Sequence, residues 1–447
     1  MVSRLLAAGL LIGSALLAWL VIASALAARL LQAVIGLSVL YVGYLAYRGW
    51  RLIRASLAAG ARPPERSAAD RGGHPFISVV VPARNEAPVI SDVVADLIAQ
   101  RYGPPEAPAF EVVVLDAGSE DGTGALAVEA ARNAGALADR FRVLSPELMA
   151  GTKTKGAALA RATSELRGTT VAVVDADARV GPHFLEAVMA AWSRDPDAVA
   201  IQARRHPVNE RDSWLTAAQA EEQLMDLATQ CGRRQADGTA ELRGNGMFVR
   251  REALDSVGGW NARAITEDLD VSTRLAAAGE HVALAPEVLV GEEAVTTLAD
   301  LWTQRMRWAE GSLRRLMEHG PRLLAGSAPL VRKLDFLAFT GEFLIPPLFA
   351  ASVIASLITI PLPIRMDWTI PISLFAGYGL GSFLLALAGL SGVGVSGTEL
   401  IGRSLRGALF LSHWLVVVPT ALVRIAIGPQ TTTFRQTPRM GRASTDR

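Results

Sequence analysis

A short segment in the last third of the chain combines side chains that suit a phosphorylated sugar. Residues 301–308 read Leu-Trp-Thr-Gln-Arg-Met-Arg-Trp. The guanidinium groups of Arg305 and Arg307 can pair with phosphate oxygens, and Gln304 adds an amide. The indole of Trp308 can cover the apolar carbons of a sugar ring. The segment therefore predicts a site for a diphosphate and a sugar.

An acidic run about forty residues earlier offers a proton acceptor. It contains Thr266, Glu267, Asp268 and, two positions on, Asp270. We interpret Asp268 as a general base that takes the proton from an acceptor hydroxyl. Glu267 and Asp270 are competing candidates, and any of the three could instead cap a helix that starts near Leu269.

A pair of carboxylates follows the apolar strand expected at residues 171–174. Asp175 and Asp177 are separated by one residue, so an extended chain places both on the same side. Such oxygen ligands suit Mg²⁺, with Mn²⁺ as an alternative, and a substrate diphosphate and water would complete the coordination. The ion would neutralise charge on a departing nucleoside diphosphate. Acidic residues at strand ends are common, so this pair indicates a metal site only together with the other motifs.

Two polar loops follow the first two expected strands. Glu86 and Asp116 lie in these loops and can accept hydrogen bonds from a pyrimidine N–H or from ribose hydroxyls. Asp116 could equally cap a turn or a helix. Lys155 precedes a further helix, where an ammonium group would lie near a nucleotide; we favour it over Lys153, although both could simply be solvated.

The strands and helices expected between residues 76 and 310 alternate, which predicts an α/β domain with a mostly parallel sheet and ligands at the carboxyl ends of its strands. The strands are expected at 76–81, 111–115, 142–144 and 170–174, and the helices at 91–100, 124–134 and 156–166. The chain has no Gly-x-Gly-x-x-Gly after the first strand and no Walker A lysine, so a dinucleotide dehydrogenase or P-loop enzyme is disfavoured.

The chain is 51% hydrophobic and 19% charged, and the apolar excess lies at its two ends. Residues 1–50 are long enough for two transmembrane helices, whereas a signal peptide would have a shorter apolar stretch. Residues 51–75 form an arginine-rich linker, which places the domain at 76–311 on the cytoplasmic side of the cell inner membrane. The single cysteine, Cys231, agrees with a reducing compartment. A net charge of +1 argues against a nucleic-acid binder and leaves the basic flanks to interact with the lipid bilayer.

The remaining residues suggest further membrane contact. Residues 312–334 mix leucines with basic residues, as in helices that lie at the membrane interface, although an amphipathic helix on the soluble core is the alternative. Residues 335–428 contain candidate spans near 340–361, 369–391 and 405–427, and residues 335–347 could be re-entrant or interfacial. Three spans would place the basic tail at 429–447 outside, whereas two or four would return it to the cytosol. The sequence leaves this number open.

Taken together, these motifs resemble, in type and order, those of membrane-bound family 2 glycosyltransferases over roughly residues 76 to 310. The resemblance implies a GT-A type fold, a UDP-sugar donor, a divalent metal and inversion at the anomeric carbon. It also implies roles for individual residues: Glu86 and Asp116 at the uridine, Lys155 at the nucleotide, Asp175 and Asp177 at the metal and diphosphate, Asp268 as the base, and Gln304, Arg307 and Trp308 closing over the diphosphate and acceptor.

Four further segments are most similar to the cyanobacterial monoglucosyldiacylglycerol synthases within that family. They span residues 243–251, 258–261, 291–297 and 307–311. This similarity implies transfer of glucose from UDP-glucose to diacylglycerol or another lipid acceptor. Two alternatives remain. A processive polysaccharide synthase of the cellulose, hyaluronan or poly-N-acetylglucosamine type would share the motifs. A membrane scaffold with an inactive transferase domain would be expected to lack a metal or base carboxylate, and both are present.

Overall fold

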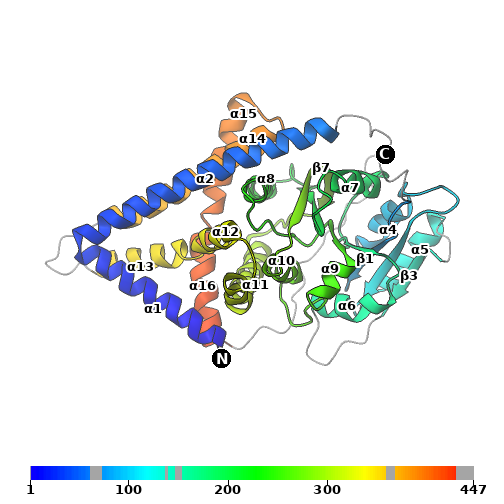
Figure 1. Ribbon diagram of the computed structural model, residues 1–447, viewed down its shortest axis with the longest axis horizontal. Helices are drawn as coiled ribbons and strands as arrows, with labels where there is room; N and C mark the ends of the chain where they lie inside the picture. The colour runs from blue at the N-terminus through cyan, green and yellow to red at the C-terminus, as the bar shows by residue number, and fades with distance from the viewer. Residues whose placement is uncertain (1, 61–72, 136–138, 146–153, 359–367, 429–447) are drawn as a thin grey trace.

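A computed structural model describes residues 2–60, 73–135, 139–145, 154–358 and 368–428 (Figure 1). Lys153, residues 61–72 of the expected linker and the expected tail at 429–447 lie outside the described residues. An α/β domain occupies one end of the molecule, and a group of long apolar helices projects from the other. The prediction of an α/β fold flanked by candidate transmembrane helices is confirmed.

A seven-stranded sheet forms the centre of the α/β domain, with strand order β3-β2-β1-β4-β6-β5-β7. Strand β6 runs antiparallel to β4 and β5, while the other neighbouring pairs are parallel. The strands are β1 (Ile77–Ala83), β2 (Phe110–Asp116), β3 (Phe141–Leu144), β4 (Thr170–Val173), β5 (Ala200–Pro207), β6 (Met247–Arg250) and β7 (Val282–Glu292). The predicted mostly parallel sheet is therefore present, with one antiparallel strand.

Both faces of this sheet are buried, which explains its nearly continuous apolar strands. Because successive side chains of a strand point to opposite faces, Val79 and Val81 of β1 lie on one face of the sheet and Val80 lies on the other. The first face is covered by α4 (Ile90–Ile98), α5 (Thr123–Asn133) and α7 (Phe184–Trp192). The second is covered by α6 (Lys155–Ala162), α9 (Arg251–Ser256) and α10 (Glu267–Ala277). The two layers hold the carboxyl ends of the central strands in fixed positions at one edge.

Two long helices connect this domain to the apolar helices at the other end of the molecule, which we call the membrane-side helices: the connecting helices are α8 (Trp214–Gln235) and α11 (Leu298–Ala325). Helix α8 crosses α2 (Ala25–Gly60) so closely that a Cβ atom added at Gly232 would collide with the carbonyl oxygen of Leu45. Helix α11 contains the Gln304 to Trp308 motif and continues without a break into the first part of the segment expected to form interface helices. Its buried Leu313 and Leu323 pack against other helices of the protein.

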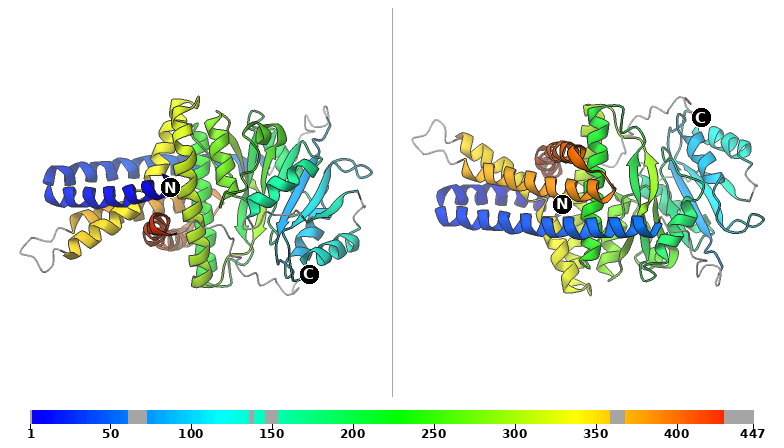
Figure 2. Two further views of the ribbon diagram at one scale, coloured as in Figure 1. Left: turned by 90° about the horizontal axis from the view of Figure 1, so that it is seen from below. Right: turned by 90° about the horizontal axis from the view of Figure 1, so that it is seen from above.

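The remaining helices are α1 (Val2–Ala23), α12 (Leu330–Gly341), α13 (Ile345–Ile358), α14 (Thr369–Gly392), α15 (Gly397–Leu411) and α16 (Trp414–Ile427). By length and composition, five segments among the described residues could cross a membrane. Helices α1, α2, α13 and α14 extend together away from the sheet (Figures 1 and 2). Helix α16 crosses their base: it runs vertically in Figure 1 and is seen end-on in Figure 2.

Candidate active site

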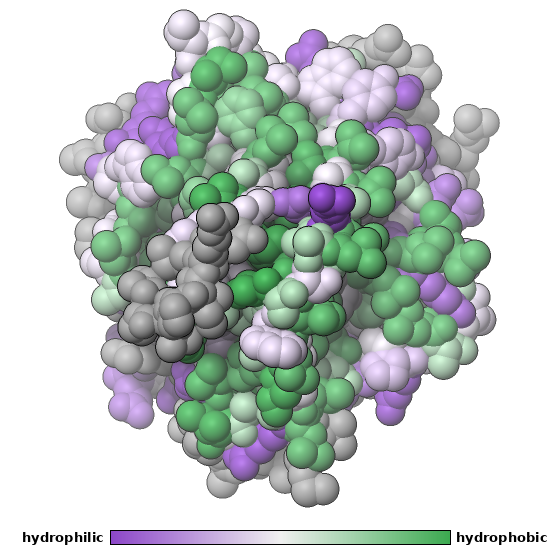
Figure 3. Space-filling view, turned by 90° about the vertical axis from the view of Figure 1, so that its left-hand side faces the viewer, coloured by the Kyte–Doolittle hydropathy of each residue, from purple (hydrophilic) through white to green (hydrophobic). Residues whose placement is uncertain are grey.

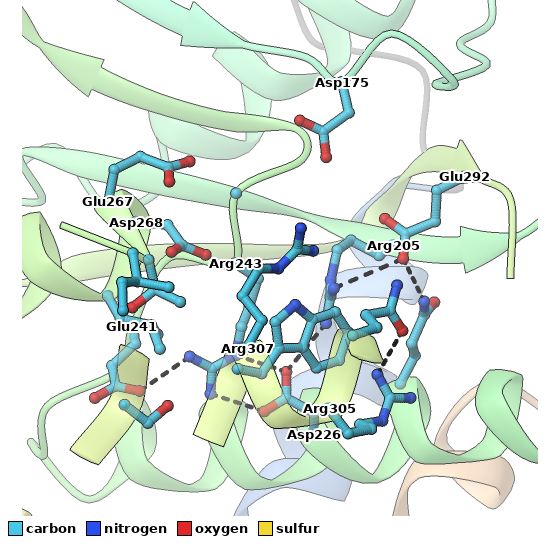
Figure 4. A pocket seen from close by; sticks show the side chains of 18 of the residues that line it. Asp175, Arg205, Asp226, Glu241, Arg243, Glu267, Asp268, Glu292, Arg305 and Arg307 are labelled. Atoms are coloured by element: carbon cyan, nitrogen blue, oxygen red, sulfur yellow. Dashed lines mark hydrogen bonds and ion pairs between the residues drawn. The ribbon is translucent and has the colours of Figure 1, made fainter. Parts of the chain in front are cut away.

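A cavity of about 460 Å³ lies between the carboxyl edge of the sheet and the membrane-side helices (Figure 4). It brings together nearly all the residues singled out from the sequence, namely Glu86, Lys155, Asp175, Asp177, Asp268, Gln304, Arg305, Arg307 and Trp308. Asp116 is the exception. Its Oδ1 accepts a hydrogen bond from the backbone N–H of Ser119 at 2.8 Å, so it stabilises the turn after β2, and the neighbouring Ala117 lines the cavity instead.

The Asp175 and Asp177 carboxylates line the cavity just beyond the end of β4. The side chain of Asn245 orients the first of them by accepting the backbone N–H of Asp175 at 3.1 Å. Asp177 Oδ2 accepts the backbone N–H of Glu293 at 2.9 Å. In the part of the chain that the structure describes, no group of three or more His, Cys, Asp or Glu side chains is arranged around a metal position. The two carboxylates fit a hard divalent cation and would supply two of its oxygen ligands, so the others would have to come from bound molecules.

Lys155 lies beside this carboxylate pair at the start of α6. Its Nζ is 2.5 Å from Asp175 Oδ1 and 3.3 Å from Glu267 Oε1. Burial lowers the pKa of Lys155, but the attraction of Asp175 and Glu267 outweighs burial and raises that pKa above its ordinary value. The side chain is therefore a partly buried cation beside the carboxylates at the sheet edge.

The acidic run begins helix α10, whose first residue is Glu267 rather than the expected Leu269. Asp270 faces away from the cavity, and its Oδ1 lies 2.8 Å from His319 Nε2 while Arg274 pairs with its other oxygen at 2.7 Å. Asp270 thus anchors α10 to α11. The first turn of a helix favours such carboxylates because the helix dipole is positive there.

The two remaining carboxylates both line the cavity: Glu267 pairs with Lys155, and Asp268 lies beside Gly244. A Cβ atom added at Gly244 would lie 3.3 Å from Asp268 Oδ2, so the glycine leaves room next to this carboxylate. Burial raises the pKa of both Glu267 and Asp268. A raised pKa makes Asp268 a better proton acceptor than an exposed aspartate.

The cavity floor is an ionic network that the sequence did not reveal (Figure 4). Arg243 pairs with both oxygens of Asp226 at 2.8 Å and with Glu241 at 2.9 Å. Glu241 also accepts a hydrogen bond from Arg315 at 2.6 Å. Burial alone would raise the pKa of Glu241, but the nearby arginines lower it to about 2. Of these residues only Arg243 stands in a segment singled out from the sequence, because they come from α8, α11 and the loop before β6 and meet only in the folded chain.

Arg305 is held by the protein itself. Its side chain is buried and forms an ion pair with Glu222 of α8. Its guanidinium carbon lies 4.2 Å from the ring centroid of Trp308 and 5.9 Å from that of Trp414, and Trp414 Nε1 donates to Glu222 Oε1 at 3.0 Å. We call these four side chains the Arg305 clamp. Arg305 thus packs against the ring of Trp308 and helps to fix its position. Arg307 also lines the cavity.

The opposite end of the cavity is mostly apolar, with the carboxylate of Glu342 among its lining residues, and belongs to the membrane-side helices. It is lined from α12, the turn after it, α14, α15 and α16 by Phe339, Phe343, Tyr378, Leu385, Leu411, Trp414 and Val418. A single space therefore joins buried carboxylates and cations at the sheet edge to an apolar wall. This arrangement suits a reaction between an anionic, phosphate-bearing molecule and an apolar one.

Comparison with known proteins identifies the family of this site. The sequence profile described as "Glycosyltransferase like family 2" matches residues 74–311. The chain belongs to glycosyltransferase family 2. This glycosyltransferase is 31% identical over 380 residues to the β-monoglucosyldiacylglycerol synthase of Trichormus variabilis, covering 83% of this chain and 78% of that protein. It is 30% identical over 397 residues to the synthase of that name from Synechocystis, covering 87% and 80%.

A solved structure supports the fold of this family 2 glycosyltransferase. The mannosyltransferase PcManGT from Pyrobaculum calidifontis, solved with GDP-Man and Mn²⁺, superimposes with a TM-score of 0.50. The match covers 88% of this chain and 98% of the mannosyltransferase at 20% identity. The predicted GT-A type fold and the prediction of a glycosyltransferase are confirmed.

Proposed function

We propose that this enzyme transfers glucose from UDP-glucose to the free hydroxyl of 1,2-diacylglycerol at the cytoplasmic face of the inner membrane, forming β-monoglucosyldiacylglycerol. The observation that carries the proposal is the single cavity with a charged end at the sheet and an apolar end among the membrane-side helices. The names of the two cyanobacterial relatives support the same donor sugar and lipid acceptor.

The charged end would bind the donor. Glu86 lies at the end of β1, where a nucleotide base or ribose would meet the sheet, and Lys155 would contact the phosphates. Asp175 and Asp177 would hold Mg²⁺ or Mn²⁺, and such an ion, when bound with the diphosphate, withdraws negative charge from the leaving group. The complex of PcManGT with Mn²⁺ and a nucleotide sugar supports a divalent ion in this fold.

The apolar end would bind the acyl chains, and the acceptor hydroxyl would then lie between Trp308 and Asp268. Asp268 removes the proton of this hydroxyl as its oxygen attacks the anomeric carbon of glucose from the side opposite the diphosphate. The bond from that carbon to the phosphate oxygen breaks, UDP departs with the bonding electron pair, and the configuration inverts. Trp308 and Gln304 would keep the sugar in line, and Arg307 would help to hold the departing UDP.

Incubation of the purified enzyme with radiolabelled UDP-glucose and dioleoylglycerol in vesicles tests this function. We expect label in the organic extract, in a product cleaved by a β-glucosidase. Label that remains in ethanol-insoluble material after lipid extraction would instead support a processive polysaccharide synthase and refute the proposal. Parallel reactions with UDP-galactose and UDP-N-acetylglucosamine, with and without the lipid, test the donor sugar. A preference for either of them would contradict the assignment of glucose.

A further inference from the structure

The last apolar segment, Gly397–Ile427, is long enough to cross a membrane, but its shape differs from that of a straight span. Helix α15 ends at Leu411 and α16 begins at Trp414, so the segment is broken near its middle. Helix α16 runs across the base of the projecting helices, and the chain after α15 therefore does not continue outward along them (Figures 1 and 2). We call α15 and α16 together the strap.

The first part of the strap is tied to the catalytic domain by charge. Glu221 of α8 is fully buried and accepts hydrogen bonds from Arg403 Nε at 3.0 Å and Arg406 Nε at 2.8 Å. Two guanidinium groups on one buried carboxylate form a strong, directional attachment, because each is a charge-assisted hydrogen bond. This part of the strap therefore lies against α8.

The middle and the end of the strap are tied to the same domain. Trp414, which begins α16, donates to Glu222 of α8 at 3.0 Å. Near the end of α16, Arg424 Nε lies 3.7 Å from Glu310 Oε2 on α11. A helix that crossed the roughly 30 Å hydrocarbon core would carry its two ends to opposite sides. The attachments at 403, 414 and 424 instead keep the whole strap on one side.

Helix α16 is apolar on both faces, whereas the two faces of α15 differ in polarity. The inner face of the strap buries Val417, Ala421 and Ile425 against Met306, Ala309 and Leu313 of α11. Its outer face presents apolar side chains spaced by about one helical turn on α15 and scattered along α16: Ile401, Leu405, Leu409, Val416, Val423 and Ile427, which are 43–79% exposed. On α15 the outer face is apolar, while Arg403 and Arg406 point inward to Glu221, which is the pattern of an amphipathic helix held at the surface of a bilayer.

The outer face is continuous with the lipid-exposed surface of the projecting helices. Helix α1 packs against α16, and Arg4 near its start donates to the carbonyl oxygen of Gly428 at 2.7 Å. Hydrophobic residues gather over much of the middle of the molecule when it is viewed from the end of the projecting helices, with hydrophilic residues mainly towards the rim (Figure 3). An apolar surface of this size on a membrane protein fits the acyl boundary of a lipid leaflet.

We propose that the strap does not cross the membrane but lies in the headgroup region of the leaflet that faces the catalytic domain, with its outer face in contact with lipid. Four candidate spans then remain among the described residues, so the chain after the strap returns to the side of the catalytic domain. The basic residues at positions 435, 439, 442 and 447 follow the strap, in agreement with the positive-inside rule. The proposal does not depend on the identity of the sugar or of the acceptor.

Depth measurements with a fluorescent label test the strap. Cys231 is buried, and its replacement by alanine gives a background in which single cysteines can be placed at Leu405, Val416 and Val423. In vesicles, we expect a nitroxide attached near the lipid carbonyls to quench all three labels more strongly than a nitroxide near the end of the acyl chain.

Two further labels serve as controls. A label at Leu380 in the middle of α14 should show the opposite order, and a label at Val128 on α5 should be quenched by neither nitroxide. Stronger quenching of Val416 than of Leu405 and Val423 by the deep nitroxide would overturn the proposal.

Labelling from one side of sealed vesicles provides an independent test on otherwise native protein. A cysteine at Val128 reports the side of the catalytic domain, and a cysteine at Ser444 reports the side of the C-terminal residues. We expect a membrane-impermeant maleimide to modify both from the same side. Modification from opposite sides would show that the strap crosses the membrane.

Discussion

At the scale of single residues, the first turn of α10 shows how neighbouring carboxylates acquire different tasks. Asp270 is held by His319 and Arg274, and Glu267 is paired with Lys155, which leaves Asp268 beside the open space at Gly244. Identity and spacing alone could not separate these three candidates. Their partners exclude Asp270, because a carboxylate that is fixed by cations on the far side of the helix cannot reach an acceptor hydroxyl, while Glu267 and Asp268 both line the cavity and differ in the ion pair of Glu267 with Lys155.

We expect Asp268→Asn to reduce kcat by about 1,000-fold or more, because general-base catalysis contributes roughly 10² to 10⁴ in rate, while UDP binding remains nearly unchanged. Calorimetric titration with UDP and a radiochemical assay measure the two quantities. Glu267→Gln should retain more activity than Asp268→Asn. If Glu267→Gln abolished turnover and Asp268→Asn did not, Glu267 would be the base.

The burial of Asp268 also predicts how the activity of the wild-type enzyme depends on pH. Asp268 accepts a proton only when ionised, and its pKa is raised, so kcat/KM should fall as the pH decreases through that raised pKa. The acidic limb of the pH profile should therefore lie above the ordinary value of 3.8 for an aspartate. An acidic limb at or below that value would contradict the role of Asp268 in the free enzyme.

We expect Asp177→Ala to weaken UDP binding in the presence of Mg²⁺ by about tenfold, equivalent to about 1.4 kcal/mol. Binding measured in EDTA should change little, because the carboxylate acts through the ion. Asp255→Ala removes an exposed carboxylate on α9 and serves as the control. Equal Mg²⁺ dependence in Asp177→Ala and wild type would count against the metal assignment.

At the scale of elements, α11 matters because it carries the Gln304 to Trp308 motif and also contacts both α10 and α16. The Arg305 clamp joins this helix to α8 and α16 through Glu222 and Trp414. A displacement of α16 would therefore shift Trp414, its partner Glu222 and Arg305, and so change the position of the Trp308 ring.

Substitution of Arg305 tests the clamp. Arg305→Ala should lower kcat by up to about 100-fold, since a small misplacement of a positioning group can cost that much, whereas UDP affinity should be nearly unchanged. Arg305→Lys should recover part of the activity by keeping the charge beside Glu222. Arg314→Ala removes an ion pair with Glu310 on the same helix, away from the main cavity, and should have little effect on kcat. Loss of UDP affinity in parallel with kcat would indicate that Arg305 contacts the diphosphate directly.

At the scale of the whole molecule, buried ion pairs join the catalytic domain to the helices beneath it. Glu241 of the catalytic domain contacts Arg243, Arg315 and Arg233, and Arg233 in turn pairs with Asp335 of α12. Breaking such a pair on one side leaves an uncompensated buried charge.

The free energy of unfolding in detergent should consequently depend on pH. The pKa of Glu241 is about 2 in the folded protein and 4.5 as its ordinary value, so its stabilising contribution is present above pH 4.5 and is lost as the pH falls towards 2. Glu241→Gln should destabilise the protein by about 3 kcal/mol at neutral pH and should flatten this acidic decline. Denaturant unfolding at several pH values measures both effects, and an unchanged slope in the variant would contradict the assignment.

The sequence by itself determined the α/β alternation, the order of the motifs and the apolar ends, because strand and helix periodicity and local loop chemistry depend on neighbours in the chain. It thereby indicated most of the residues that line the cavity. Only the tertiary structure showed that Asp116 serves its turn, that Arg305 is clamped, that Asp226 and Glu241 form the cavity floor, and that the last apolar segment is bent across the base of the helices. The turn at Asp116 is local and was one of the two readings that the sequence offered, whereas the contacts of the cavity floor and the Arg305 clamp join residues from 17 to 192 positions apart, such as Asp226 with Arg243 or Glu222 with Trp414. No local pattern encodes such contacts.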